Sequence, residues 1–302
     1  MRYNRNKHLP DSVKDLNFNL DSQQIPDGFL QGDIHTTGVD STPDSRHIIF
    51  ATTEQLKRMG EQKVWYIDAT FKIVKKPFMQ LFSVHVIIKS GDCMKQIPVA
   101  FVLMSRRRKK DYIKVFKKLL DLVDSPQVEK IMLDFEAAMW SALRELMANG
   151  TLPKVDLRGC LFHFTQAVFR RIIIIGLKDQ YWRDAGTRNL CKQCMSLPLI
   201  PTEHVPLVFP ELKRRLLASE VTLLHQLVPY IENTWINGMW NPSNWGQFDQ
   251  AIRTNNDVEG FHNKMNHICQ KPNVEFSTLV KELHKEAVFI YTTAVHVFRG
   301  QT

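Results

Sequence analysis

Three acidic residues in separate parts of the chain have neighbours that suit a metal site. Asp68 and Asp134 each end an apolar, strand-like run (WYIDATF and KIMLDF), and Glu259 lies in a polar stretch typical of a helix start (RTNNDVEGFHN). Carboxylate oxygens are the ligands that Mg²⁺ prefers in proteins. Two such ions about 4 Å apart can activate an attacking hydroxyl and stabilise a leaving oxygen. These residues therefore predict metal-dependent cutting or joining of phosphodiester bonds.

Each of the three acids, taken alone, has an ordinary explanation as a strand-end or helix-cap residue. A carboxylate at the end of a buried strand is costly to desolvate, however, so a bound cation or an arginine partner is expected beside it. The occurrence of all three acids in such contexts favours a shared metal site over three unrelated structural roles.

The elements that must bring these carboxylates together are predicted from hydrophobic spacing and turn residues. The predicted order is β-β-β-α-β-α-β, with ranges 64–74, 80–90, 94–105, 110–124, 128–135, 136–148 and 155–164. The first three strands form an antiparallel meander. The order matches the ribonuclease H topology, an α/β fold with a mixed sheet in which the first and fourth strands are adjacent and parallel. A right-handed crossover would then bring Asp68 and Asp134 within reach of a shared cation.

The composition divides the chain into four segments. Residues 1–45 are polar and rich in turn residues, and are predicted to be an irregular lead-in. Residues 46–164 hold the first part of the ribonuclease H-like core. Residues 165–250 are predicted to be an all-α insertion that precedes the last of the three acids. Residues 251–302 return the chain to the core and include a long amphipathic helix.

The order and spacing of these motifs resemble the transposases of the Mutator-like element (MULE) class. The matching blocks, which lie between about 50 and 300, are DATF (68–71), PFMQLF (77–82), DFE (134–136), GCLFHF (159–164), WNPSNW (240–245) and RTNNDVEGFH (253–262). The resemblance implies a catalytic triad of two aspartates and one glutamate (DDE), here Asp68, Asp134 and Glu259. It also implies two Mg²⁺ or Mn²⁺ ions per site, and cutting and strand transfer of double-stranded DNA at element ends and target.

Two departures from the family pattern keep a second function open. The first block has Ala69 where the family usually has glycine, which adds only a methyl group beside the metal ligand. The zinc-finger domain usual upstream in such transposases is not found, so the sequence resembles a catalytic core without its targeting module. The alternative to an active transposase is a domesticated, non-catalytic nuclear factor that binds DNA or protein. A ribonuclease H-type enzyme acting on RNA ranks third.

A C-x-x-H pair, Cys160 and His163, directly follows the last predicted strand of the core. The resemblance assigns this pair to the active-site region, where it organises the site or contacts DNA. Cys191 and Cys194 form a C-x-x-C pair further along. Together with Cys160 and His163 they have the residue types of a Cys₃His zinc site. Spacing of three residues in an amphipathic helix favours two core-facing thiols instead. We therefore do not expect zinc.

Five consecutive cations, Arg106, Arg107, Arg108, Lys109 and Lys110, lie between the third strand and the first helix of the predicted core. They predict contacts with DNA phosphates, or a nuclear import signal. The alternative is a solvated loop that caps the helix. Cations at a helix N-terminus oppose the helix macrodipole, and this mismatch favours a functional role.

Arg253, Asn255 and Asn256 lie about one turn ahead of the glutamate and are predicted to contact DNA oxygens. Either asparagine can instead cap the helix that carries the glutamate. Trp240 and Trp245 suit stacking on an unpaired base, although tryptophans in a helical segment are more often core residues.

The composition of the 302-residue chain is that of a globular protein, with 44% hydrophobic and 24% charged residues. A net charge of +9 favours a polyanionic partner such as nucleic acid. Five irregularly spaced cysteines point to a reducing compartment. No apolar run approaches the ~20 residues that cross a bilayer, so no membrane partner is expected. We expect a nuclear protein, and a homodimer because transposases generally act as dimers.

Overall fold

The computed structural model describes residues 13, 15–21, 23, 25–37, 43–90, 93–250, 252–254, 256–268 and 272–299. The chain forms two compact units. The first unit is Met1–Glu129, Ala138–Val155 and Asp257–Thr302, and the second is Lys130–Ala137 and Asp156–Asn256. Among the described helices, none has the length and apolar character that a membrane crossing requires.

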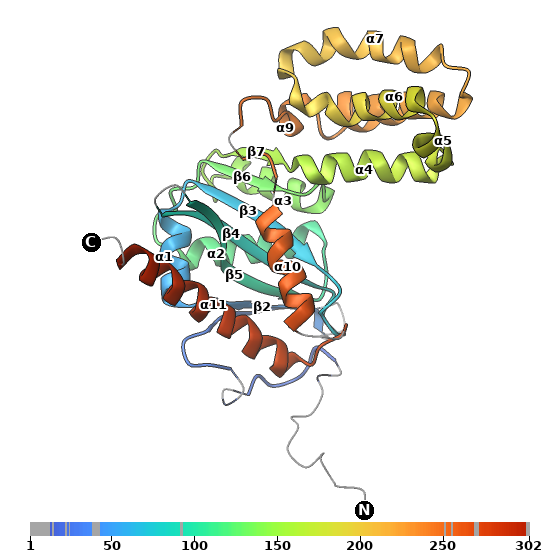
Figure 1. The fold of residues 1–302 in the computed structure, drawn as a ribbon. Helices are drawn as coiled ribbons and strands as arrows, with labels where there is room; N and C mark the ends of the chain where they lie inside the picture. Colours follow the sequence, from blue (N-terminus) through green and yellow to red (C-terminus); the bar gives the residue numbers. More distant parts are fainter. Residues whose placement is uncertain are drawn as a thin grey trace, which may run out of the picture. The chain divides into compact units, whose positions relative to one another are not determined.

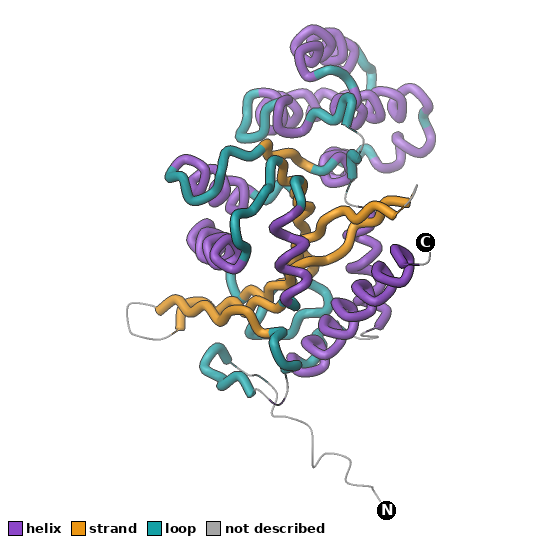
Figure 2. Tube along the Cα trace, turned by 90° about the vertical axis from the view of Figure 1, so that its left-hand side faces the viewer, coloured by secondary structure: helices purple, strands orange, loops and turns teal. Residues whose placement is uncertain are grey.

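The first unit contains an antiparallel sheet with helices packed on both faces (Figures 1 and 2). Its strands have the order β1-β2-β5-β4-β3. They are β1 (Leu30–Thr37), β2 (Pro43–Phe50), β3 (Val64–Thr70), β4 (Gln80–Ser90) and β5 (Cys93–Met104). The helices are α1 (Thr53–Glu61), α2 (Lys109–Leu122), α3 (Ala137–Ala148), α10 (Asn256–Ile268) and α11 (Phe276–Arg299).

The predicted meander is confirmed, since β4 pairs antiparallel with both β3 and β5. Successive side chains of a strand point to opposite faces of its sheet. Phe82 of β4 therefore packs against Phe116 of α2, with ring centroids 5.7 Å apart, while Leu81 joins the core cluster of α10 and α11. Because both faces are covered here, β3, β4 and β5 carry apolar residues on both faces instead of a strict apolar-polar alternation.

The second unit contains a parallel pair of strands and a set of helices. The strands are β6 (Lys130–Leu133) and β7 (Asp156–Gly159). The helices are α4 (Leu161–Ile174), α5 (Lys178–Arg183), α6 (Ala185–Ser196), α7 (Val205–Leu217), α8 (Leu227–Ile231) and α9 (Pro242–Trp245). The protein thus has the predicted α/β class, with antiparallel and parallel strand pairs. The sequence predicts β6 and β7 to be part of the core segment 46–164, whereas here they share a unit with the helices.

The prediction that residues 1–45 are irregular is wrong for β1 and the start of β2. β1 pairs with β2 in an antiparallel register that includes Asp33 opposite Ile48. β1 is the edge strand of its sheet, with β2 as its neighbour. A strand held mainly by backbone pairing at an edge needs little apolar periodicity, so its polar sequence gave no strand signal.

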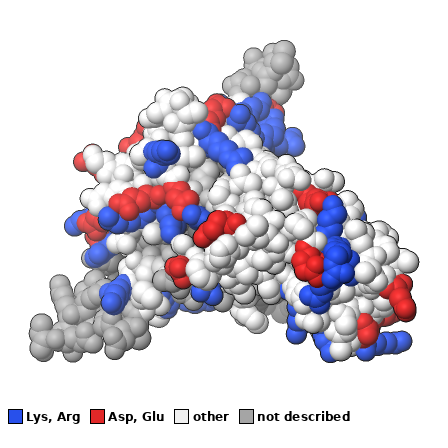
Figure 3. All heavy atoms as spheres, turned by 90° about the horizontal axis from the view of Figure 1, so that it is seen from above, with Lys and Arg blue, Asp and Glu red and all other residues white. Residues whose placement is uncertain are grey.

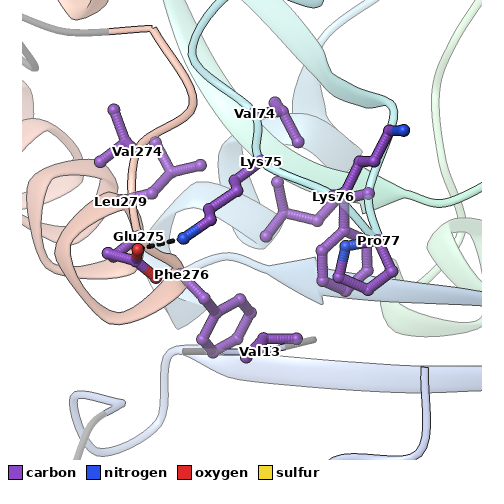
Figure 4. A pocket seen from close by; sticks show the side chains of 11 residues that line it. Val13, Val74, Lys75, Lys76, Pro77, Val274, Glu275, Phe276 and Leu279 are labelled. Atoms are coloured by element: carbon purple, nitrogen blue, oxygen red, sulfur yellow. Dashed lines mark hydrogen bonds and ion pairs between the residues drawn. The ribbon is translucent and has the colours of Figure 1, made fainter. Parts of the chain in front are cut away.

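A short backbone pairing anchors the α10–α11 connection to the chain segment that follows β3. Val74 and Val274 form a parallel bridge, and the amide of Val274 donates to the carbonyl of Ile73 at 2.9 Å. Beside this bridge Lys75 forms an ion pair with Glu275, at the rim of a small, mainly apolar pocket (Figure 4). The pairing ties α10 to the strand that carries Asp68.

A buried carboxylate, Asp111, ties the start of α2 to β2. Its side chain accepts hydrogen bonds from Ser45 Oγ at 2.7 Å, His47 Nε2 at 3.2 Å and Arg108 Nε at 2.7 Å. Burial by itself raises the pKa of Asp111, but the hydrogen bonds from His47, Arg108 and Ser45 outweigh it and hold the pKa well below the ordinary value. Asp111 is therefore ionised in the folded protein.

We expect Asp111→Asn to lower the free energy of unfolding by about 2–4 kcal/mol at pH 7, because it removes the charge that satisfies buried donors. Urea denaturation measures the loss. An aspartate has a pKa of about 3.9 in an unfolded chain. The Asp111 contribution is therefore fully present above about pH 4 and lost as the pH falls toward the lower folded pKa.

The wild type and Asp111→Asn should accordingly differ by a constant amount between pH 5 and 7 and converge below about pH 4. Asp121→Asn is the control, since Asp121 is an exposed acid of the same helix. A difference between wild type and Asp111→Asn that stays the same down to pH 3 would contradict this account.

Candidate functional site

The carboxylate of Asp68 lies in β3 and is almost fully buried, with 5% of the residue exposed. Its Oδ1 accepts a hydrogen bond from the amide of Ala69 at 2.8 Å. Its Oδ2 lies 3.6 Å from Nδ1 of His262, a residue of α10. Both carboxylate oxygens therefore have a contact that fixes their orientation.

Two buried side chains of β4 continue this set of contacts. Ser83 pairs with Asp68 across the sheet, and its Oγ lies 3.3 Å from His262 Nε2. His85 is two residues further along β4, so it shares the face of Ser83, and its Nε2 lies 2.9 Å from Ser83 Oγ. Burial, followed by the nearby His262, lowers the pKa of His85 well below the ordinary histidine value, so its ring is neutral.

The sequence analysis missed His262, Ser83 and His85 as site residues. Two residue spacings in the sequence could have identified them as neighbours on one face of an element. Glu259 and His262 are three residues apart, a spacing that places two positions of a helix on one face. Ser83 and His85 are two residues apart in a strand, which has the same effect in a sheet.

In the second unit, Asp134 directly follows β6, and its Oδ1 accepts a hydrogen bond from the amide of Glu136 at 3.3 Å. β6 and β7 are parallel and in register, with Leu133 opposite Gly159. The amide of Cys160 then donates to the carbonyl of Leu133 at 2.9 Å. The C-x-x-H pair thus starts at the same end of the strands as Asp134.

The predicted strand 155–164 is too long, because β7 ends at Gly159 and α4 begins at Leu161. Phe164, Val168 and Ile172 of α4 recur every four residues and are all buried in the core of the second unit. This helical stripe outweighs the strand propensity of the local sequence. His163 therefore lies in the first turn of α4, with Cys160 at its N-cap.

Burial separates the two roles that were open for the C-x-x-H pair. Cys160 is fully buried, which suits an organising role and leaves little surface for DNA. Burial, together with the positive charge of Arg170, lowers the pKa of His163 to about 4. His163 is therefore neutral at physiological pH.

The segment before α10 docks on the same helix start. The carbonyl of Arg253 accepts from the amide of Leu161 at 3.0 Å, and the exposed guanidinium of Arg253 donates to the carbonyl of Gln250 at 3.1 Å. Asn255 lies outside the described residues. Asn256 is the first residue of α10, but its side chain is not among those described.

Glu259 lies in α10, one turn before His262, and its side chain is also outside the described part of the chain. Asp68 and Asp134 belong to different units. The gathering of the three carboxylates around metal ions therefore stays a prediction. Among the side chains that the structure describes, no three His, Cys, Asp or Glu residues are grouped as ligands. The donor chemistry of Asp68 and Asp134 nevertheless fits a hard cation, since both offer carboxylate oxygens.

The thiols of Cys191 and Cys194 face the core of the second unit, as the helical spacing predicts. Burial raises the pKa of Cys191 to about 11 and that of Cys194 to about 12, so both are protonated thiols. Trp245 is likewise a core residue, and its Nε1 donates to the carbonyl of Trp235 at 2.7 Å.

Much of the basic run 106–110 is engaged with the protein's own acids. Arg108 binds Asp44 at 2.9 Å and Asp111 at 2.7 Å, and Lys110 binds Asp44 at 2.8 Å. Hydrogen bonds from Arg108 and Lys110 lower the pKa of Asp44 to about 2. On the face drawn in Figure 3, several groups of Lys and Arg lie directly beside Asp and Glu. Arg108 therefore serves as the N-cap of α2, as the structural alternative predicts.

Arg106 and Arg107 differ from Arg108, because both are exposed. The guanidinium carbon of Arg107 lies 4.8 Å from the ring centroid of Phe71, a residue that is itself 50% exposed. Phe71 follows β3 directly. An exposed aromatic ring with adjacent arginines is suited to contact nucleic acid.

Gly159 of the GCLFHF motif is explained by packing. A Cβ at this position would lie 2.1 Å from Cζ of Phe135, the residue that follows Asp134. The Phe135 ring is in turn held by Trp235 and Trp240, with centroids 4.7 Å and 5.5 Å away. Only glycine leaves room for the ring beside the chain segment that carries Asp134.

We expect Gly159→Ala to lower the free energy of unfolding by about 1–3 kcal/mol through overpacking. The smaller side chain in Phe135→Leu should relieve part of this cost, giving a coupling of at least about 0.5 kcal/mol in a double-mutant cycle measured by denaturation. Gly186→Ala is the control, since a Cβ there meets Asp184 only at 3.4 Å. Strict additivity of Gly159→Ala and Phe135→Leu would show that the ring is not the cause.

Comparison with known families gives one match. Residues 64–167 match the model of the MULE transposase domain. The matched segment runs from β3 into α4 and so includes Asp68, Asp134, Cys160 and His163. A search of curated proteins finds no match to the chain.

Proposed function

We propose that the chain is the catalytic core of a transposase that cuts and joins double-stranded DNA by two-metal phosphoryl transfer, because residues 64–167 match the model of the MULE transposase domain. A transposase domain implies interaction with DNA. The finer parts of this proposal are the DDE triad, the metal ions and the reaction.

The observation that carries the proposal is the buried, oriented carboxylate of Asp68 within the matched segment. An ionised carboxylate in a protein interior is costly unless hydrogen bonds or a cation compensate its charge. Asp68 has contacts from the amide of Ala69 and the ring of His262. A divalent cation bound at this carboxylate would stabilise its negative charge further.

The order of secondary structure supports a ribonuclease H-like fold. An antiparallel meander of β3, β4 and β5 is followed by α2, β6, α3 and β7, with β7 parallel to β6. This is the predicted β-β-β-α-β-α-β order. The helices α4 to α9 then precede α10, which carries Glu259, as expected for an insertion before the last acid.

In the proposed mechanism, Asp68, Asp134 and Glu259 would hold two Mg²⁺ or Mn²⁺ ions, which would supply activation of the attacking hydroxyl and stabilisation of the leaving oxygen. The neutral ring of His163 and the buried thiol of Cys160 organise the start of α4 beside Asp134.

Side chains outside the triad position the DNA in this proposal. Arg106, Arg107 and Arg253 are exposed and bind phosphate oxygens. A nuclear location and a homodimer remain parts of the proposal, because the substrate is chromosomal DNA and two element ends must be processed together.

The proposal is tested by incubating the purified chain with labelled DNA and Mg²⁺ or Mn²⁺. We expect nicking and joining, and a loss of at least about 1,000-fold for Asp68→Asn, Asp134→Asn and Glu259→Gln, because each removes several kcal/mol of transition-state stabilisation. Glu220→Gln, a change of an exposed acid, is the control.

Cleavage that persists in both Asp68→Asn and Glu259→Gln would refute the triad. Tight DNA binding without cleavage by the wild type would identify the domesticated, non-catalytic factor. Preferential cutting of an RNA–DNA hybrid would identify a ribonuclease H-type enzyme.

The arginines of the basic run should separate by role. We expect Arg106→Ala and Arg107→Ala each to weaken DNA binding and to reduce the slope of log affinity against log salt by about 1, because each removes one phosphate contact. Arg108→Ala should instead lower the unfolding free energy, since Arg108 binds Asp44 and Asp111. Fluorescence anisotropy at several salt concentrations and urea denaturation measure the two effects. Equal effects of all three changes on DNA binding would contradict this division.

A further inference from the structure

We infer that His262 is a positioning residue, held in place by Ser83 and His85, that orients the carboxylate of Asp68 toward a divalent cation. This inference rests on the proposed function, and assigns a task to three residues outside the DDE triad. The four side chains come from β3, β4 and α10 of the first unit.

The direction of the hydrogen bonds follows from Asp68, the first member of the series Asp68, His262, Ser83 and His85. An ionised Asp68 only accepts hydrogen bonds, so its Oδ2, 3.6 Å from Nδ1 of His262, favours the tautomer that carries a proton on Nδ1. In the neutral tautomer, Nε2 of His262 is then an acceptor. The hydroxyl of Ser83 has two acceptors within reach, this nitrogen at 3.3 Å and the carbonyl oxygen of Asp68 at 3.5 Å, and the shorter distance favours donation to His262.

His85, the last member of this series of contacts, gives the same direction of hydrogen bonding. The ring of His85 is neutral and fully buried. Among the described residues its Nδ1 has no hydrogen-bond partner, and a buried N–H without an acceptor is rare. The proton of His85 therefore sits on Nε2 and donates to Ser83 Oγ at 2.9 Å. Ser83 accepts from His85 and donates to His262, so both ends agree.

The surroundings show that these polar groups are not needed to fill space. Phe261 of α10 packs edge-on against His85 at 5.2 Å and stacks on Phe101 at 5.7 Å, inside an apolar core cluster. Well-packed apolar side chains often serve such positions at no loss of stability. A directed polar chain that ends on a carboxylate indicates a role at that carboxylate.

The consequence for Asp68 is a fixed carboxylate plane. Oδ1 is oriented by the amide of Ala69 and Oδ2 by His262. A carboxylate oxygen has two lone-pair sites, so a hydrogen bond and metal coordination are compatible on the same oxygen. A residue that hydrogen-bonds to a metal ligand usually contributes about 10–100-fold to metal affinity or activity.

The same contacts set the position of α10. His262 lies one turn after Glu259, so its contact with Asp68 also fixes the helix backbone that carries the last acid of the triad. The pairing of Val274 with Val74 anchors the end of the following connection. One contact within α10 and one after it thus relate this helix to β3 and the segment that follows β3.

The test uses a matched pair of substitutions in the full chain. Asparagine can present an amide N–H where Nδ1 of histidine lies, whereas glutamine presents it near the position of Nε2. We expect His262→Gln and Ser83→Ala to weaken Mn²⁺ binding by about 10–100-fold, and His262→Asn to restore it to within about threefold of the wild type. Isothermal titration calorimetry measures the affinity, and thermal melting checks that each variant is folded. His267→Gln, a change of an exposed histidine of α10, is the control.

A second readout does not depend on metal or activity. With ¹⁵N-labelled histidine, nitrogen chemical shifts should show His262 protonated on Nδ1 and His85 on Nε2, and Ser83→Ala should change the tautomer ratio of His262. In cleavage assays, His262→Gln should lower kcat with little change in the KM for DNA, because the DNA contacts are untouched.

The outcomes separate the two proposals. A wild type that binds Mn²⁺ and cuts DNA, together with a His262→Gln variant of the same Mn²⁺ affinity, overturns the positioning role and leaves the proposed function standing. Loss in His262→Gln without recovery in His262→Asn, when both are folded, also overturns it. If the wild type neither binds Mn²⁺ nor cuts DNA, the proposed function fails and the positioning role fails with it.

Discussion

The cost of burying an ionised carboxylate in the protein interior is the constraint on which this structure depends. The first unit meets that cost in two ways. Asp111 is compensated by a guanidinium, an imidazole and a hydroxyl of the protein itself. Asp68, equally removed from solvent, is contacted by a backbone amide and a histidine ring. The first arrangement is built from side chains of β2 and the start of α2, whereas the second joins β3 to α10 through His262.

Burial also explains why the residues around the candidate site take the types they do. Gly159 is required because the ring of Phe135 occupies the space of a side chain. Cys160 and His163 lie at the start of α4, where a neutral ring and a buried thiol help to order the chain next to Asp134. Gly159 and Cys160 of the GCLFHF motif are therefore buried in packing positions next to the segment that carries Asp134.

The charge of the protein is distributed less simply than its net value suggests. Arg108 and Lys110, within the most basic run of the chain, are bound to Asp44 and Asp111. Arg106 and Arg107 are exposed, and Arg107 lies against the exposed ring of Phe71, the residue that directly follows the strand of Asp68. A DNA contact in this region would therefore depend on a few side chains and not on a uniform positive field.

The sequence by itself determined the α/β class, the meander of β3, β4 and β5, the helices of residues 165–250 and the MULE resemblance, because apolar periodicity and motif spacing are local properties. It missed β1, whose stability comes from pairing with β2, and it extended β7 into α4. The contacts of Arg108 with Asp44 and of Ser83 with His262 join residues 64 and 179 positions apart. Such pairs leave no local pattern, so only the tertiary structure, which sets which buried polar groups meet, decided how Asp68 is held.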